Sequence, residues 1–104
     1  MSLTPEGKVK RQISKLLKDK GVWYFMPPAN GYGRKGIPDY MASANGYLVG
    51  VEAKADATKK PTALQIRCGE EMIASGAHWM VVCDDRTLGI LEELLCSLLN
   101  RPKP

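Results

Sequence analysis

The sequence predicts an α/β layered domain with the element order α-β-β-β-α-β-α around a mostly four-stranded mixed sheet. Three observations predict it: capped segments with apolar residues at helical spacing, an Asn-Gly turn between two apolar runs, and a separate apolar run between the second and third helical segments. With 104 residues the chain has the size of one domain. We expect residues 1–100 to form that domain and residues 101–104 to be a disordered tail.

Each expected helix begins or ends at a recognisable residue. Thr4 as N-cap and Pro5 at the first helical position open the first helix, and Gly21 closes it. Thr62 caps the second helix, which runs to about Ser75. The third helix covers roughly residues 87–100, and its leucines fall on one face.

Four apolar runs predict the strands: residues 22–26, 40–44, 47–53 and 79–83. Asn45-Gly46 joins the second and third runs, which is the strongest short signal for a β-hairpin. The fourth run is continuously apolar, as is typical of a buried strand. The three glycines between residues 29 and 38 predict a loop.

The spacing of the cysteines and the lack of long apolar segments exclude several classes of protein. Cys68, Cys83 and Cys96 have no zinc spacing with the single histidine, so we expect buried, reduced thiols. The first residues contain no apolar segment and no run approaches the roughly 20 residues of a membrane span, so we expect neither a secretory signal nor a membrane partner. The protein should therefore stay in the cytoplasm of the cell that makes it.

The strongest chemical pattern combines Asp39, Glu52 and Lys54. Asp39 starts one strand of the hairpin and Glu52 lies near the end of the other, so they are expected to be cross-strand neighbours. Strand alternation places Lys54 on the same face as Glu52. Two carboxylates about 4 Å apart repel by roughly 4 kcal/mol, which Mg²⁺ or Mn²⁺ would offset. An ion-paired strand end explains the same residues without a metal.

Two further polar residues lie on otherwise apolar helix faces. Glu6 falls within the apolar arc of the first helix, where it would point toward the sheet or simply stabilise the helix dipole. Gln65 lies within the apolar arc of the second helix, where its amide would bind a site group or the backbone. Both readings stay open for each residue.

The N-terminal part of the chain is basic. Residues 1–38 contain eight Lys/Arg against Glu6 and Asp19, a pattern that suits nucleic acid but also a solvated helix surface. Lys8 and Arg11 on the first helix are candidate DNA contacts. In the glycine-rich loop, Arg34 and Lys35 would pair with phosphates and Tyr32 would stack on a base, unless the loop is a plain surface connector.

The strings NGYGRKGIPDYMAS and GVEAKADATKKPTALQ resemble the VRR-Nuc family of small nuclease domains, within the PD-(D/E)xK superfamily. The resemblance implies a restriction-endonuclease-like layered fold. It also implies metal ligation by Asp39, Glu52 and the backbone carbonyl of Ala53. Lys54 would be the catalytic lysine and Gln65 would support the site. Glu6 would match the family's acid on the first helix, which is the weakest correspondence.

The function expected from these features is structure-selective endonuclease activity with Mg²⁺ or Mn²⁺ and no small-molecule cofactor. Stand-alone, often phage-borne, members of the family tend to be homodimers that cut branched DNA, similar to Holliday junction resolvases. The leucine-rich last helix is a candidate dimer surface, although core packing explains it as well. The alternatives are a non-catalytic nucleic-acid-binding module and a phage interaction protein.

Overall fold

A computed structural model describes residues 3–28 and 33–104 of the chain. Within these ranges the element order is the one that the sequence predicts. The elements are α1 (Pro5–Asp19), β1 (Trp23–Phe25), β2 (Tyr40–Ala44), β3 (Tyr47–Ala53), α2 (Ala63–Ala74), β4 (His78–Val82) and α3 (Asp85–Leu99).

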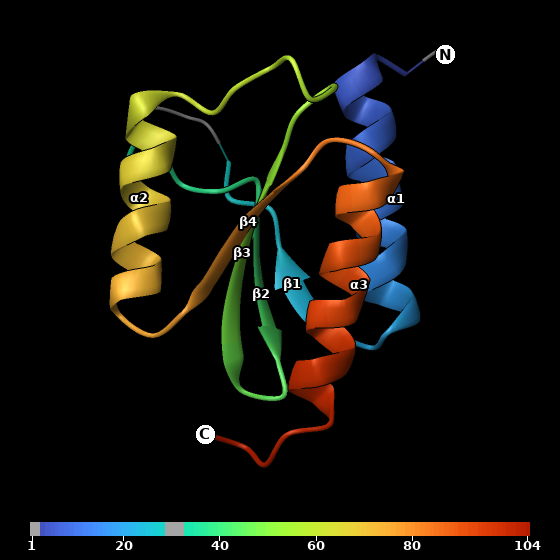
Figure 1. Cartoon of the computed structure of the whole chain (residues 1–104), viewed down its shortest axis with the longest axis vertical. Coiled ribbons are helices and arrows are strands. Elements are labelled where there is room, and N and C mark those ends of the chain that lie inside the picture. The colour runs from blue at the N-terminus through green and yellow to red at the C-terminus, as the bar shows by residue number, and fades with distance from the viewer. Residues whose placement is uncertain (1–2, 29–32) are drawn as a thin grey trace.

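The four strands form one mixed sheet in the order β1-β2-β3-β4. β1, β2 and β3 are antiparallel neighbours, whereas β4 runs parallel to β3 after the crossover through α2. Figure 1 shows α1 and α3 on one side of the sheet and α2 on the other. The sheet is therefore the middle layer of three.

The main core lies between the sheet and the α1–α3 layer. Strand alternation directs Val49, Val51 and Ala53 of β3 to this side, where each is at most 1% exposed. Ile13 and Leu17 of α1 meet them, and they are fully buried because the apolar stripe of α1 faces the sheet. The opposite side of β3 is thereby left for Gly50 and Glu52.

The hairpin between β2 and β3 turns at Asn45 and Gly46, whose φ angles are 55° and 88°. Two consecutive positive φ angles are what a two-residue hairpin turn requires, and Asn-Gly tolerates them. The Asn45 side chain also donates to the Leu98 and Arg101 carbonyls. Residues 101–104, expected to be disordered, lack helix and strand but contact this hairpin, where the Tyr47 hydroxyl donates to the Pro102 carbonyl.

Two elements differ from the sequence-based expectation. β4 is an edge strand, and only Val82 in it is buried, because α2 covers one side of it incompletely. α3 begins two residues before Thr87, since Asp84 is its N-cap and Thr87 completes a capping box with it. The cysteines are free as expected, but of the three only Cys68 is buried.

The leucines of α3 belong to the core of this chain. Leu91, Leu95 and Leu98 are completely buried against the sheet and α1. The surplus apolar surface that suggested a dimer interface on this helix is therefore used within the chain. Only Ile90 and Leu99 leave large exposed apolar side chains on α3.

Candidate active site

Asp39 lies directly before β2, after the buried Pro38. The pairing of Tyr40 with Val51 continues one step further and places Asp39 opposite Glu52. The Asp39 Oδ2 atom accepts a hydrogen bond of 2.8 Å from the backbone N–H of Ala53. This bond fixes the carboxylate at the end of β3, so the hairpin brings the two predicted acids together.

Glu52 is 1% exposed, and its two carboxyl oxygens have different surroundings. Oε1 accepts a hydrogen bond of 3.0 Å from Gln65 Nε2, whereas Oε2 is buried without a hydrogen-bond partner. Burial, reinforced by the neighbouring Asp39 carboxyl, raises the pKa of Glu52 to about 8. A buried carboxyl oxygen without a partner is costly, and a cation placed there would remove that cost.

Gln65 connects this carboxyl to the first turn of α2. Its Oε1 accepts from the Thr62 backbone N–H at 2.8 Å, and its own backbone N–H donates to Thr62 Oγ1 at 3.2 Å. The two bonds form a capping box that leaves Nε2 free to donate to Glu52. The sequence left open whether this amide binds a site group or the backbone. It does both, because Oε1 accepts from the backbone and Nε2 donates to Glu52.

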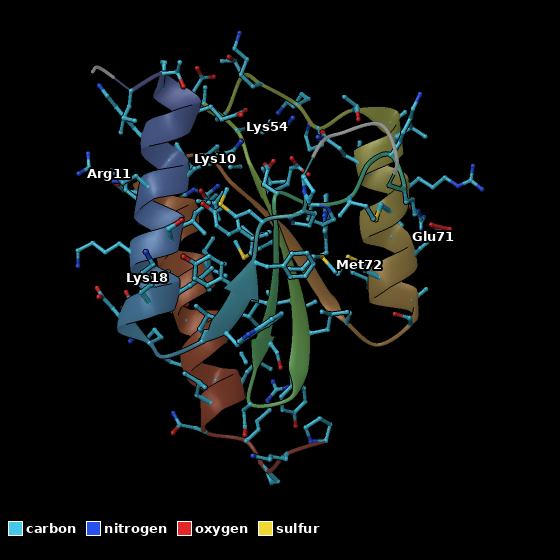
Figure 2. All side chains as sticks on the ribbon, turned by 180° about the vertical axis from the view of Figure 1, so that it is seen from behind. Lys10, Arg11, Lys18, Lys54, Glu71 and Met72 are labelled. Atoms are coloured by element: carbon cyan, nitrogen blue, oxygen red, sulfur yellow. The ribbon has the colours of Figure 1, made fainter. Side chains whose placement is uncertain are left out.

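Lys54 follows β3 and extends the sheet, because its backbone N–H donates to the Val82 carbonyl at 3.0 Å. Its side chain is half-buried, and its charge acts on Glu52 by lowering the pKa of that carboxyl, against the larger effect of burial. Figure 2 shows Lys54 and Lys10 at the same end of the molecule, beside α1. The predicted lysine therefore acts electrostatically on the predicted acid.

Lys10 is a site residue that the sequence analysis missed. Its Nζ lies 3.7 Å from Asp39 Oδ1 and 3.4 Å from Glu6 Oε2. Burial lowers the pKa of Lys10, but the Asp39 and Glu6 carboxylates outweigh it and raise that pKa overall. The Tyr40 hydroxyl donates to the Lys10 carbonyl at 2.7 Å, which sets the rotation of α1 over the hairpin. The Glu6–Lys10 spacing of four residues was the available signal.

Glu6 is held at the margin of the site by Lys10. Within residues 3–28 and 33–104, no three His, Cys, Asp or Glu side chains form a group that could hold a metal ion. Lys10 contacts Glu6 on one side and Asp39 on the other. The acids that the structure brings together are thus Asp39 and Glu52, and Glu6 forms an ion pair instead of completing a third ligand position.

A cavity of about 380 Å³ opens beside Asp39 and Gln65. It is bounded by the segment after β1, the glycine-rich loop and the start of α2; its lining includes Pro27, Pro28, Lys35, Pro38 and Thr62. Gly36 has a φ of 83°, and a Cβ there would come within 2.4 Å of the Leu64 carbonyl oxygen. The loop therefore needs glycine to approach α2 this closely. Glu52 lies behind Asp39 and Gln65.

The expected DNA contacts have different surroundings. Lys8 and Arg11 are exposed on α1, and Lys35 is exposed on the cavity wall. Arg34 forms an ion pair with Glu71 of α2, so its charge is already partly balanced. Tyr32 lies outside the described residues.

No family model matches the sequence, and neither does any curated protein. A solved structure described as "VRR_NUC domain" is similar to 88% of this chain and 97% of that chain, with a TM-score of 0.77 and 28% sequence identity. The chain has the fold of a VRR-Nuc domain. The family resemblance indicated by the sequence motifs is thereby confirmed.

The site of this VRR-Nuc-like domain fits a hard divalent cation. Asp39 and Glu52 provide carboxylate oxygens side by side, and the Glu52 Oε2 atom has no other partner among the described residues. Mg²⁺ is commonly held by one or two carboxylates and keeps several waters, so the missing third acid is no obstacle. Soft zinc ligands are absent from this pair of residues, which favours Mg²⁺ or Mn²⁺.

Proposed function

We propose that this VRR-Nuc-like domain is an endonuclease that hydrolyses phosphodiester bonds in DNA with Mg²⁺ or Mn²⁺. The observation that carries the proposal is the buried Glu52 carboxyl, which has one unpartnered oxygen and lies opposite Asp39. A structural ion pair would give Glu52 a cationic partner within contact distance, but among the described residues Glu52 forms no salt bridge, and Lys10 contacts Asp39 instead. A bound cation explains the arrangement better.

In the proposed reaction, Asp39 and Glu52 hold the cation together with the backbone carbonyl of Ala53. The cation, when bound, polarises a phosphoryl oxygen and makes its water ligand more acidic. Gln65 orients Glu52 through the 3.0 Å hydrogen bond and keeps one of its oxygens directed to the site. Lys54 would hold the attacking water or stabilise the negative charge that develops on the phosphoryl oxygens. The attacking water loses a proton to solvent as its oxygen bonds to phosphorus, the bond from phosphorus to the leaving sugar oxygen breaks, and that oxygen takes up a proton from solvent.

We further propose branched DNA as the substrate and a homodimer as the active form. The exposed Lys35 on the cavity wall supports a polyanionic partner at the site, and the exposed Lys8 and Arg11 extend positive charge along α1. A dimer would have to use a surface other than the leucine stripe of α3, because that stripe is buried in the core. A two-fold dimer would present two sites, as cutting a junction symmetrically requires.

Two alternatives make different predictions. A non-catalytic DNA-binding module would bind DNA without cutting it under any metal condition. An interaction protein would respond neither to metal nor to DNA. The charge of Lys54 acts on the buried Glu52 carboxyl, and a buried acid with a raised pKa beside a lysine favours catalysis over both alternatives.

The first test is ligand linkage. Mg²⁺ or Mn²⁺ should raise the melting temperature of the wild type and leave that of Asp39→Ala unchanged, because only the native site binds the ion. Asp56→Ala is a matched control, since Asp56 is an exposed acid in the loop after β3. A wild type whose melting temperature ignores both ions would contradict the proposal.

The second test is cleavage of linear, nicked, flap and four-way DNA with each metal, followed on gels. Cleavage of the four-way or flap substrate by the wild type, lost in Asp39→Ala and Glu52→Gln, is the expected result. DNA binding without cleavage of any substrate would favour the binding module instead. The mass of the protein in solution, measured by light scattering, tests the dimer.

A further inference from the structure

Two exposed aromatic side chains lie on the short edge strand β1. Trp23 is 66% exposed and Phe25 is 47% exposed, and their ring centroids are 5.8 Å apart. Tyr24 between them points to the opposite side, where its ring meets Tyr40 at the edge of the core. The strand therefore divides its aromatics between the core, which receives Tyr24, and the solvent, which is in contact with Trp23 and Phe25.

The register of the sheet places these two rings on the same face as the candidate site. Phe25 pairs with Met41, which lies two residues after Asp39, the residue directly before β2. Because strand residues two apart share a face, Trp23, Phe25 and Asp39 point to one side of the sheet. Standard strand spacings put the Cα atoms of Phe25 and Asp39 about 8 Å apart. The rings are thus one or two nucleotides away from the two acids.

Helix α2 leaves this part of the face uncovered. It packs over the β3–β4 half of the sheet, where a Cβ on Gly69 would overlap the Trp79 ring and a Cβ on Gly50 would lie 2.8 Å from Met72. Figure 2 shows Met72 directed from α2 toward the sheet. The Trp23 and Phe25 rings lie beyond this contact, on the far edge strand.

We infer that Trp23 and Phe25 form a stacking platform for unpaired bases of the DNA strand whose backbone passes Asp39 and Glu52. This inference rests on the proposed nuclease function and specifies the part of the substrate that is single-stranded. The two ring centroids are 5.8 Å apart and the ring planes are inclined by 54°, so each exposed ring presents its face to a separate base. Aromatic faces accept any base, so the platform would recognise unpaired structure and not sequence.

The charges around the rings favour a nucleic acid over a second protein. Neither β1 nor β2 contains an acidic residue. Arg34 and Lys35 line the cavity beside Asp39, whereas the other six Lys/Arg of residues 1–38 lie on α1 or its C-cap, across the sheet. A DNA strand that runs from the rings along β1 and β2 toward Asp39 meets no carboxylate of these two β-strands. A second copy of this chain, which also has a net charge of +4, would be repelled by the first, and this opposes association through the patch.

The test is binding of a fluorescent single-stranded thymidine oligonucleotide in EDTA, measured by anisotropy so that cleavage plays no part. Trp23→Leu and Phe25→Leu keep an apolar side chain but remove the aromatic face. Each should weaken binding about tenfold, whereas Trp23→Phe should retain most of the affinity. Leu99→Ala, an exposed apolar position on α3, is the matched control and should bind as the wild type does.

An oligonucleotide with abasic sugars shows whether the rings contact bases. On this ligand the leucine variants should lose almost nothing relative to the wild type, because there is no base to stack. An equal loss on both oligonucleotides, or no loss on either, would overturn the inference. So would a Trp23→Ser variant that converts a dimer to a monomer, since the patch would then join two copies of the chain.

These outcomes are separable from those of the proposed function. If the Trp23→Leu and Phe25→Leu variants bind the oligonucleotide normally and the wild type cleaves DNA with Mg²⁺, the stacking platform is refuted and the proposed nuclease function stands. Ring-dependent binding without cleavage of any substrate would refute the nuclease and support the platform.

Discussion

Replacing Glu52 by glutamine should remove a pH dependence of stability that arises from the burial of this carboxyl. The pKa of Glu52 is raised from an ordinary 4.5 to about 8 in the folded protein. Between these values the native state keeps a proton that the unfolded chain has released. The free energy of unfolding therefore falls as pH rises, by about 1.4 kcal/mol per unit. The stabilisation is complete below about pH 4.5 and lost as pH passes through 8.

Between pH 5.5 and 7.5 this amounts to a loss of roughly 2–3 kcal/mol, a large part of the stability of a small domain. Urea denaturation in EDTA, followed by circular dichroism at several pH values, measures it directly. With an ordinary urea dependence the midpoint should move by about 1 M or more. Saturating Mg²⁺ at pH 7.5 should restore the loss, because the ion binds the ionised carboxylates.

The Glu52→Gln variant is the control, since it keeps the shape of the side chain and cannot ionise. The difference in unfolding free energy between wild type and variant isolates Glu52 from other groups that titrate in this range. Parallel pH profiles for the two proteins would refute the reasoning, because Glu52 would then have the same proton affinity folded and unfolded.

Three further outcomes are expected. Lys54→Ala should slow cleavage about 10²- to 10³-fold in single-turnover assays, while the Mg²⁺-dependent rise in melting temperature persists; loss of that rise would contradict a role on phosphorus. Glu71→Gln should release Arg34 from its ion pair and so strengthen DNA binding. In titrations at several salt concentrations, the salt dependence of binding should become steeper by up to about one unit of slope. An unchanged slope would show that Arg34 does not reach DNA. Gly36→Ala should destabilise the protein by about 2–4 kcal/mol in urea denaturation, whereas Gly33→Ala, which has open space around its Cα, should not.

The pairing of Asp39 with Glu52 was predictable because a two-residue turn leaves no freedom of register. Asn45-Gly46 fixes which residues of β2 and β3 are opposite, and the pairing follows along the hairpin to the site. The helix ends were predictable for a similar reason, since Thr4 and Thr62 mark them locally.

The contacts between elements that are distant in the sequence could not be predicted from local sequence signals. Whether Lys8, Lys10 or Arg11 faces Asp39 depends on the rotation of α1, which Tyr40 sets through a contact 30 residues away in sequence. The pairing of Arg34 with Glu71 likewise depends on how the loop lies against α2. A leucine stripe looks the same whether it covers a sheet or a second molecule, so the sequence could not assign α3 to the core.

The side-chain amide of Gln65 belongs both to the capping box of α2 and to the hydrogen bond that holds Glu52. Fraying of the first turn of α2 therefore releases the carboxyl, and the two events share one local opening equilibrium. Any ligand that immobilises Glu52 must protect the amide protons at this helix start from exchange with solvent. Mechanical or chemical stress on the α2 terminus would conversely be transmitted to the acid before the rest of the sheet responds.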